Sequence, residues 1–178
     1  MYHYNSGEDV TIEGGGGEGG YFCLGGNFTR NFGLSADVGY QESTVYDSKE
    51  ESGIGGSFSR WYFQLTPRFI IPIKRRCQFN IGAGPGLYTT GMMFLSQSNS
   101  ESLRISYNPA FGFHSLLEFK ISLAKWISLG CGLTYYSVKY NANEVLSDNI
   151  IDVSDLKSEF RNLNGAGFDF FLGFSIKF

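Results

Sequence analysis

The stretch that decides the fold is the C-terminal sequence Phe168-Asp169-Phe170-Phe171-Leu172-Gly173-Phe174-Ser175-Ile176-Lys177-Phe178. Every second side chain from Phe168 to Phe178 is apolar, and the other register is mostly small or charged. A period of two over these eleven residues predicts a β-strand with one apolar and one mostly polar face. Chain ends are usually frayed and polar. This one stays amphipathic to its last residue.

The same alternation recurs along the whole chain and predicts eight strands. They are centred on Val10–Ile12, Phe22–Phe28, Phe32–Tyr40, Trp61–Ile71, Cys77–Leu87, Leu103–Ile121, Ile127–Tyr135 and Phe168–Phe178. Several are longer than the roughly 5–6 residues of an average globular strand, and a tilted strand needs roughly 9–11 residues to cross a bilayer. The alternation therefore favours strands that span a membrane.

The predicted connections alternate between tight turns and long polar loops. Turns are expected near Arg30-Asn31, Lys74–Arg76 and Ala124-Lys125, and loops over Ser43–Gly53, Leu95–Ser102 and Asn141–Asn162. The glycine-rich stretch Gly14–Gly20 is expected to be a flexible hairpin loop. Short turns on one side and long loops on the other are typical of transmembrane β-barrels. An even strand count then places both termini on the turn side.

Composition limits the class of protein. The 178 residues suffice for a single domain over 1–178, with an N-terminal tail at 1–8. The net charge of −3 leaves no basic footprint for nucleic acid. No apolar run approaches the roughly 20 residues of a transmembrane helix. Met1–Asn5 lacks the basic start and apolar core of a signal peptide, so we expect that an export signal has been removed or that the start lies elsewhere.

The two registers assign inside and outside. The register with Arg60, Gln64, Arg68, Asn80, Arg104, Asn108, His114, Glu118, Lys120, Asp169 and many glycines is predicted to face inward, where an eight-stranded barrel is filled by side chains. The aliphatic and phenylalanine register is nearly free of charge and is predicted to face lipid. Aromatic residues near strand ends suggest two interfacial girdles. They are Tyr40, Trp61, Tyr107 and Tyr135 at the loop ends and Phe32, Phe69, Phe79, Phe119 and Phe178 at the turn ends.

Residues 9–178 resemble the small outer-membrane barrels of the OmpA/OmpX type, the outer membrane protein β-barrel domain families of Gram-negative bacteria. The matching segments are Pro67–Pro72, Asn80–Tyr88 and Phe170–Phe178. The resemblance implies an all-β, eight-stranded antiparallel up-and-down transmembrane β-barrel in the cell outer membrane. It also implies a terminal strand recognised by the outer-membrane assembly machinery, and contact with membrane lipid and lipopolysaccharide.

The prolines Pro67, Pro85 and Pro109 conflict with regular strands because proline cannot donate to a ladder. We expect local bulges in three consecutive strands. The alternative is a lateral opening that admits an acyl chain, as in barrel acyltransferases that act on lipid A.

Few residues suggest chemistry. His114, Ser115 and Glu118 include the residue types of outer-membrane lipid A deacylases, but the neighbouring His114 and Ser115 point to opposite faces of a strand. With only His3 besides His114, a histidine metal site is not expected. The acidic residues of the Asn141–Asn162 loop fit no EF-hand spacing, so we read a solvated loop, with calcium as the alternative.

Cysteines and basic turn residues receive simple interpretations. Cys23, predicted inward, and Cys77 and Cys131, predicted outward, are an odd number and are expected to be small apolar fillers. Lys74–Arg76 is a charged turn that can touch acidic headgroups.

Asp37, Arg68 and Glu118 are expected at similar depths in the lumen. An isolated buried charge is costly, so Arg68 is expected to bond at least one of these carboxylates.

The sequence therefore predicts a monomeric outer-membrane barrel with a polar lumen filled by side chains, acting structurally or as a surface binder through its loops. No catalytic, cofactor-binding or metal-binding residue and no cofactor is expected. The alternatives are a lipid A-modifying acyltransferase or deacylase, and a narrow channel.

Overall fold

The computed structural model describes residues 2–5, 9–47, 55–97, 101–147 and 162–176. In this part of the chain all regular structure is β-strand. Within the same residues, no helix is long and apolar enough to cross a membrane.

Ten strands form the fold in the residues that the structure describes. They are β1 (Tyr2–Asn5), β2 (Asp9–Asn27), β3 (Phe32–Asp47), β4 (Gly55–Lys74), β5 (Cys77–Gln97), β6 (Glu101–Tyr107), β7 (Ala110–Ser122), β8 (Ile127–Ser147), β9 (Asn162–Asn164) and β10 (Gly167–Ile176). Residues 2–5 thus form a strand where the sequence predicted a tail. The long strands also reach further into the regions predicted as loops than expected, to Asp47, Gln97 and Ser147.

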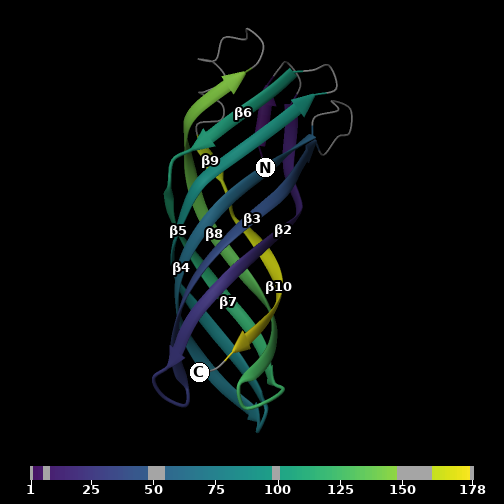
Figure 1. Cartoon of the computed structure of the whole chain (residues 1–178). Helices are drawn as coiled ribbons and strands as arrows, with labels where there is room; N and C mark the ends of the chain where they lie inside the picture. Colours follow the sequence, from purple (N-terminus) through teal and green to yellow (C-terminus); the bar gives the residue numbers. More distant parts are fainter. Residues whose placement is uncertain (1, 6–8, 48–54, 98–100, 148–161, 177–178) are drawn as a thin grey trace.

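All strand pairs are antiparallel, and neighbours in the sheet are mostly neighbours in sequence. The order begins β1-β2-β3-β4-β5. Next come β6 and β7, which follow each other along the same line, each pairing with β5 on one side and β8 on the other. β8 then pairs with β10 and, near the loop end, with β9. Asn108 and Pro109 separate β6 from β7, and Gly165 and Ala166 separate β9 from β10. The sheet curls around one long axis, with the turns at one end, called the turn end, and the last residues of β3, β5 and β8 at the other, called the loop end (Figure 1).

The strand count differs from the eight predicted. Val10–Ile12 and Phe22–Asn27 belong to one strand, because Gly14–Gly20 continues β2 and pairs with β3 instead of forming a loop. The glycines keep the chain extended here with a register shift between Gly14 and Gly17. One consequence concerns direction: β2 and β10 both run from the loop end to the turn end (Figure 1). The two chain ends therefore lie at opposite ends of the sheet, not together.

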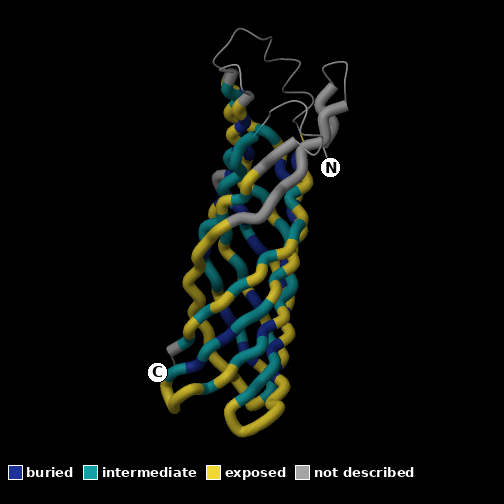
Figure 2. Tube along the Cα trace, turned by 90° about the vertical axis from the view of Figure 1, so that its right-hand side faces the viewer, coloured by how far each residue is buried: buried dark blue, intermediate teal, exposed yellow. Residues whose placement is uncertain are grey.

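The convex face carries the apolar register, which confirms the predicted orientation of the central strands. Exposed and less exposed positions alternate along the central strands (Figure 2), whereas residues 18–27 of β2 are exposed throughout. Exposed large apolar side chains include Phe22, Leu24, Trp61, Phe63, Leu65, Phe69, Ile81, Phe111, Phe113, Leu117, Leu133, Phe168, Phe170, Leu172 and Phe174. Buried polar side chains on the concave face include Ser35, Arg60, Thr66, Asn80, His114, Glu118 and Ser128.

Near the loop end the alternation changes phase. Ser59 pairs with Met92 but Trp61 pairs with Thr89, so one extra residue of β5 is inserted there. A single inserted residue reverses which side chains point inward. Met93 is therefore 3% exposed, whereas its neighbour Phe94 is 46% exposed.

The phase change creates an apolar core that the alternation in the sequence does not predict. It contains Tyr88, Met93, Leu95, Ile105, Tyr107, Val138, Tyr140, Val145 and Leu163. Ile105 and Tyr107 point inward, and Arg104 and Asn108 are exposed, which reverses the prediction for all four. The break at Asn108-Pro109 and the register shift between Ser106 and Tyr107 set β6 in the opposite phase to β7. Tyr107 therefore does not belong to an outer girdle.

The prolines interrupt pairing without bulges in β4 and β5, which corrects the prediction for Pro67 and Pro85. Gln64 opposes Gly86 and Arg68 opposes Gly82, so the register is unchanged across the site. The pairs between them are absent from the ladder, because proline has no N–H to donate. Pro109 lies in the break between β6 and β7.

Candidate functional site: the interior of the curled sheet

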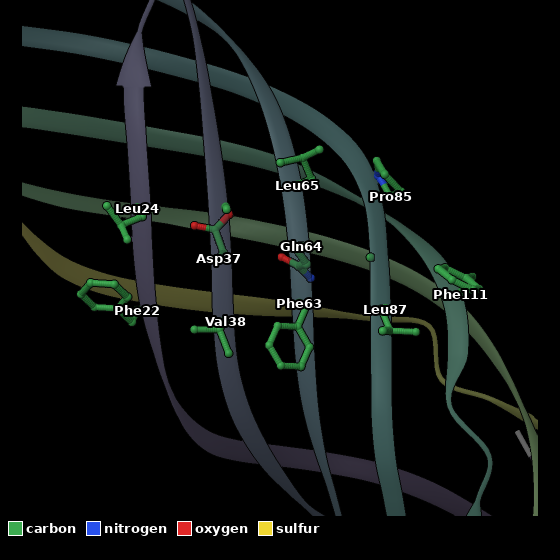
Figure 3. Close-up of a pocket in the computed structure, with 12 residues that line it drawn as sticks. Phe22, Leu24, Asp37, Val38, Phe63, Gln64, Leu65, Pro85, Leu87 and Phe111 are labelled. Carbon is green, nitrogen blue, oxygen red and sulfur yellow. The ribbon is translucent and has the colours of Figure 1, made fainter.

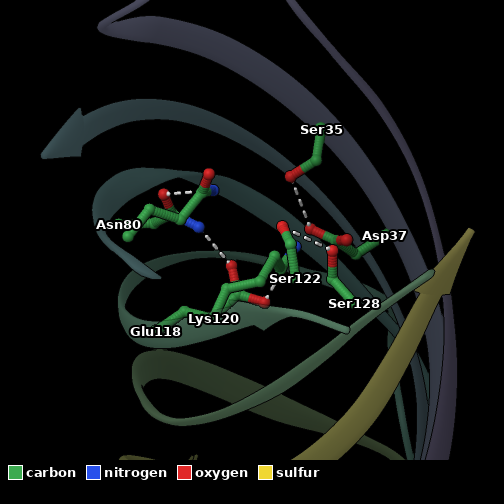
Figure 4. A network of polar contacts seen from close by, with 8 residues as sticks. Ser35, Asp37, Asn80, Glu118, Lys120, Ser122 and Ser128 are labelled. Carbon is green, nitrogen blue, oxygen red and sulfur yellow. Dashed lines mark hydrogen bonds and ion pairs between the residues drawn. The ribbon is translucent and has the colours of Figure 1, made fainter. Parts of the chain in front are cut away.

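A polar cluster occupies the turn-end half of the interior. Asn80 on β5 donates from Nδ2 to Glu118 Oε2 on β7 at 2.6 Å, and Lys120 Nζ lies 3.2 Å from Glu118 Oε1. Gln78 donates to Asn80 Oδ1 at 3.1 Å. Asn80 and Glu118 are direct partners on the neighbouring strands β5 and β7, and Figure 4 shows Asn80, Glu118 and Lys120 meeting there. Glu118 is only 8% exposed, so its charge is compensated by an ammonium group and an amide rather than by bulk water.

A second chain of polar contacts links β3, β4 and β7. Thr66 Oγ1 donates to Asp37 Oδ2 at 3.0 Å, and the same hydroxyl lies 2.8 Å from His114 Nε2. A hydroxyl has one proton, so Thr66 accepts from His114 once it has donated to Asp37. His114 Nε2 therefore carries the imidazole proton, and Nδ1 has no partner among the described residues although His114 is 1% exposed.

Arg60 organises the boundary between the polar cluster and the apolar core. It donates from Nε to Gln41 Oε1 at 2.9 Å, and Gln41 in turn donates to Asp169 Oδ1 at 2.6 Å. Its Cζ lies 3.9 Å from the centre of the Tyr136 ring, and Nη1 reaches Tyr140 Oη at 3.4 Å. A guanidinium between an amide and aromatic faces is well stabilised away from water. This chain of contacts joins β3 and β4 to β10 across the interior.

The predicted pairing of Arg68 is wrong. Neither Asp37 nor Glu118 forms an ion pair with it; Asp37 accepts from Thr66, and Glu118 pairs with Lys120 two residues along its own strand. Arg68 Nε is buried without a partner among the described residues. A Cβ added to Gly25 would lie 2.7 Å from Arg68 Nη2, so the guanidinium rests against the β2 backbone. Arg68 is nevertheless inward, as predicted.

The His114, Ser115 and Glu118 combination is not brought together. Ser115 lies opposite Ala83 and Tyr135 in the outward register, as the sequence indicated. His114 contacts Thr66, and Glu118 contacts Asn80 and Lys120. Among the described residues, the hydroxyl that contacts His114 is therefore that of Thr66 and not that of a serine.

The interior holds one large cavity of about 940 Å³. Arg68, His114, Glu118 and Lys120 line it, together with the edges of β2 and β10. The lining includes every residue from Gly19 to Asn27 and from Phe170 to Ser175, both inward and outward positions. A cavity bounded by one strand face would touch alternate residues only. This one therefore reaches the strand edges and opens sideways between β2 and β10.

The convex face carries a separate apolar groove of about 460 Å³ over β2 to β7 (Figure 3). Phe22, Val38, Phe63, Leu87 and Phe111 point out around it. The groove runs beside the interrupted ladder between β4 and β5. Among the described residues that line it, Asp37 alone is charged, and its carboxylate is turned inward to Thr66.

Other candidates have simpler outcomes. The three cysteines are free; Cys23 is exposed at the cavity edge, and Cys77 and Cys131 are half-buried. Within the described residues, no group of three histidine, cysteine or acidic side chains is placed to hold a metal ion. The acidic residues Asp148 to Glu159 of the long loop lie outside the described residues.

No family model, curated protein or solved structure matches this chain.

Proposed function

We propose that this chain is a transmembrane β-barrel of the outer-membrane type, with a structural or surface-binding role carried by the connections at its loop end. The observation that carries the proposal is the band of exposed phenylalanine and aliphatic side chains on the convex face. A water-facing sheet would place these side chains inside, and a soluble monomer rarely exposes apolar patches of this extent.

The distribution of charge on the convex side supports the proposal. Exposed charged residues gather near the two ends of the long strands and leave the middle apolar. At the turn end they are Arg30, Lys74, Arg75, Arg76 and Lys125; towards the loop end they are Glu18, Glu42, Arg104, Lys139 and Glu144. Charged side chains at mid-membrane cost several kcal/mol, on the order of 2–4 for arginine and lysine, and much less near the interfaces. The turn-end group is entirely basic and suits anionic headgroups.

Aromatic contacts near the strand ends support the same orientation. The ring centroids of Tyr40 and Trp61 are 5.3 Å apart near the loop end, and those of Phe32 and Phe69 are 5.2 Å apart beside a turn. Trp126 is exposed in the turn before β8. Aromatic belts at both interfaces are typical of membrane barrels. In this proposal the convex band binds membrane lipid and lipopolysaccharide, and the terminal strand is read by the assembly machinery of a Gram-negative outer membrane.

The two alternatives find less support. The apolar core, with Ile105, Val138 and Tyr140 at 2% exposure or less, blocks a continuous water path along the axis and argues against a channel. A lipid A-modifying enzyme needs a nucleophile or acyl-transfer pair at the interior, and Ser115 points away from His114. We therefore propose no catalytic role.

The test uses the two tryptophans, Trp61 and Trp126, which are 48% and 57% exposed on the convex side. The chain is folded into vesicles that contain lipids brominated at different depths along the acyl chain, with Trp61→Phe and Trp126→Phe as single-tryptophan variants. We expect each tryptophan to be quenched more by shallow than by deep bromines, because both lie near interfaces. A chain that stays soluble and monomeric without detergent, with neither tryptophan quenched, would overturn the membrane proposal.

A further inference from the structure

The edges of β2 and β10 are unpaired with each other although they flank the same cavity. Within the described residues, β2 pairs with β1 and β3 only, and β10 pairs with β8 only. Across the seam the contact is between side chains: the Tyr21 and Phe171 rings meet edge to face at 5.6 Å. Consecutive residues on both strands line the cavity, so their backbone edges face open space.

The direction of the two strands determines what can fill this seam. Both run from the loop end to the turn end (Figure 1). The strands that do pair in the described residues are all antiparallel. One additional strand running from the turn end to the loop end would be antiparallel to β2 and to β10 at once. It would satisfy the N–H and C=O groups on both edges, which lipid cannot do.

β1 already occupies the loop-end part of this position. Ile12 of β2 is paired with Tyr2 of β1 and also with Asp47 of β3, so β1 and β3 lie on opposite edges of β2. β1 runs antiparallel to β2, and the line that extends it backwards from Tyr2 enters the seam. We propose that the seam is a binding slot for one strand of about ten residues that continues the line and direction of β1.

The walls of the slot specify the chemistry of that strand. Its outward side chains would lie between Phe22 and Leu24 on one side and Phe170 and Leu172 on the other, all of which are exposed and apolar. Its inward side chains would lie beside the Tyr21 and Phe171 rings, which leave little space, so glycine, alanine or serine is favoured there.

At one inward position of the added strand, beside Gly25, we expect an acidic residue. Arg68 has a buried Nε without a partner among the described residues, and its guanidinium rests against Gly25 at the slot. His114 Nδ1 and Ser175 Oγ, which line the same cavity, are likewise buried without partners in that set. An aspartate beside Gly25 would compensate the Arg68 charge, and an inward serine or threonine would supply donors and acceptors to the others. The occupant is therefore an amphipathic strand with apolar outward residues and one inward acid.

The test adds such a strand and uses Cys23, which is exposed at the edge of the slot, as the reporter. In a Cys77→Ala/Cys131→Ala background, a segment of about fourteen residues is fused ahead of Met1: about five extend β1 to the level of Gly19, and the remaining nine or so fill the seam. Because β1 pairs Tyr2 with Ile12, continuing the same register places the residue about twelve positions ahead of Met1 opposite Gly25. It alternates valine or leucine outward with serine inward and carries aspartate at the level of Gly25. One matched control shifts the same residues by one position, which reverses the faces. A second control replaces the aspartate with lysine.

All variants are folded in detergent micelles, so the result does not depend on the lipid-facing proposal tested with brominated lipids. We expect the in-phase strand to slow maleimide labelling of Cys23 by about tenfold or more, since labelling then requires local opening, and to protect the β10 amides from hydrogen exchange. The shifted strand should do neither, and the lysine variant should protect less than the aspartate variant.

Three outcomes would overturn the proposal. In the first, the in-phase and shifted strands leave Cys23 equally reactive. In the second, only the in-phase strand prevents folding, judged by strand circular dichroism. In the third, Cys23 is already protected without any added strand, with a Cys23 disulfide between two chains showing that a second copy fills the seam.

Discussion

The pair formed by Lys120 and Glu118 gives the sharpest test of the interior. Glu118 is 8% exposed, and its carboxylate contacts Lys120 Nζ at 3.2 Å and Asn80 Nδ2 at 2.6 Å. Lys120→Met removes the cation and leaves the carboxylate with the amide alone. Breaking a buried pair from one side costs about 3–5 kcal/mol; because the cluster borders a water-accessible cavity, we expect about 2–3 kcal/mol here. Glu118→Gln keeps an acceptor for Asn80 and should cost less.

The double variant Glu118→Gln/Lys120→Met separates pairing from packing. It leaves no uncompensated charge, so it should be more stable than Lys120→Met alone, with a coupling energy of about 1–2 kcal/mol in a double-mutant cycle. Arg68→Met is the matched control: it also removes an inward cation on a long side chain, but one without an acidic partner among the described residues. It should cost under about 1 kcal/mol.

The assay is equilibrium unfolding in denaturant of chain refolded in detergent, followed by strand circular dichroism and by the mobility of unheated samples on gels. The reasoning fails if Arg68→Met destabilises as much as Lys120→Met. It also fails if the cycle gives no coupling, which would mean that Lys120 is neutralised by water rather than by Glu118.

Two further predictions concern the faces and the apolar core. Phe113→Arg or Leu129→Arg on the convex face should cost roughly 2–4 kcal/mol in vesicles, whereas Thr134→Arg is limited by interior space; negligible effects of both convex changes on refolding would show that the faces are reversed. Ile105→Ala should cost about 2–5 kcal/mol because the side chain is fully buried, and its exposed neighbour Arg104→Ala should stay within about 0.5 kcal/mol; equal denaturation midpoints for these two variants would contradict the phase change in β6.

The central strands could be predicted because alternation is a local property. Trp61–Ile71 and Cys77–Leu87 each show their two faces within one segment, and the structure places both as expected. The phase change near the loop end could not be predicted in this way. It depends on a single extra residue in β5 between Thr89 and Met92, where the sequence offers only another threonine and a glycine. The prediction that Ile105 and Tyr107 face outward is wrong because it extends the alternation of β7 across the Asn108-Pro109 break, where the phase reverses.

The prediction of the ion pair inside the sheet was wrong for a different reason. Depth along each strand predicts Asp37 or Glu118 as the partner of Arg68. Which residues meet across a curled sheet depends on the stagger between strands, which no single segment encodes. Glu118 also has a closer cation on its own strand. Lys120 lies two residues from Glu118 on the same face of β7, so it needs no particular stagger to reach it. Residues at i and i+2 of one strand deserve first consideration when buried charges are paired from sequence.

The apolar core and the open seam together determine where the interior cavity is closed and where it is open. At the loop end, Tyr88, Ile105 and Tyr140 fill the space inside the sheet and are fully buried. The cavity below them reaches the outside between the edges of β2 and β10, because its lining includes outward residues such as Phe22 and Leu172. In a membrane, unpaired backbone at that seam would face hydrocarbon, where each unsatisfied group costs several kcal/mol. A strand in the seam removes that cost and closes the cavity in the same step, so closure of the sheet and pairing of Arg68 are expected to occur together.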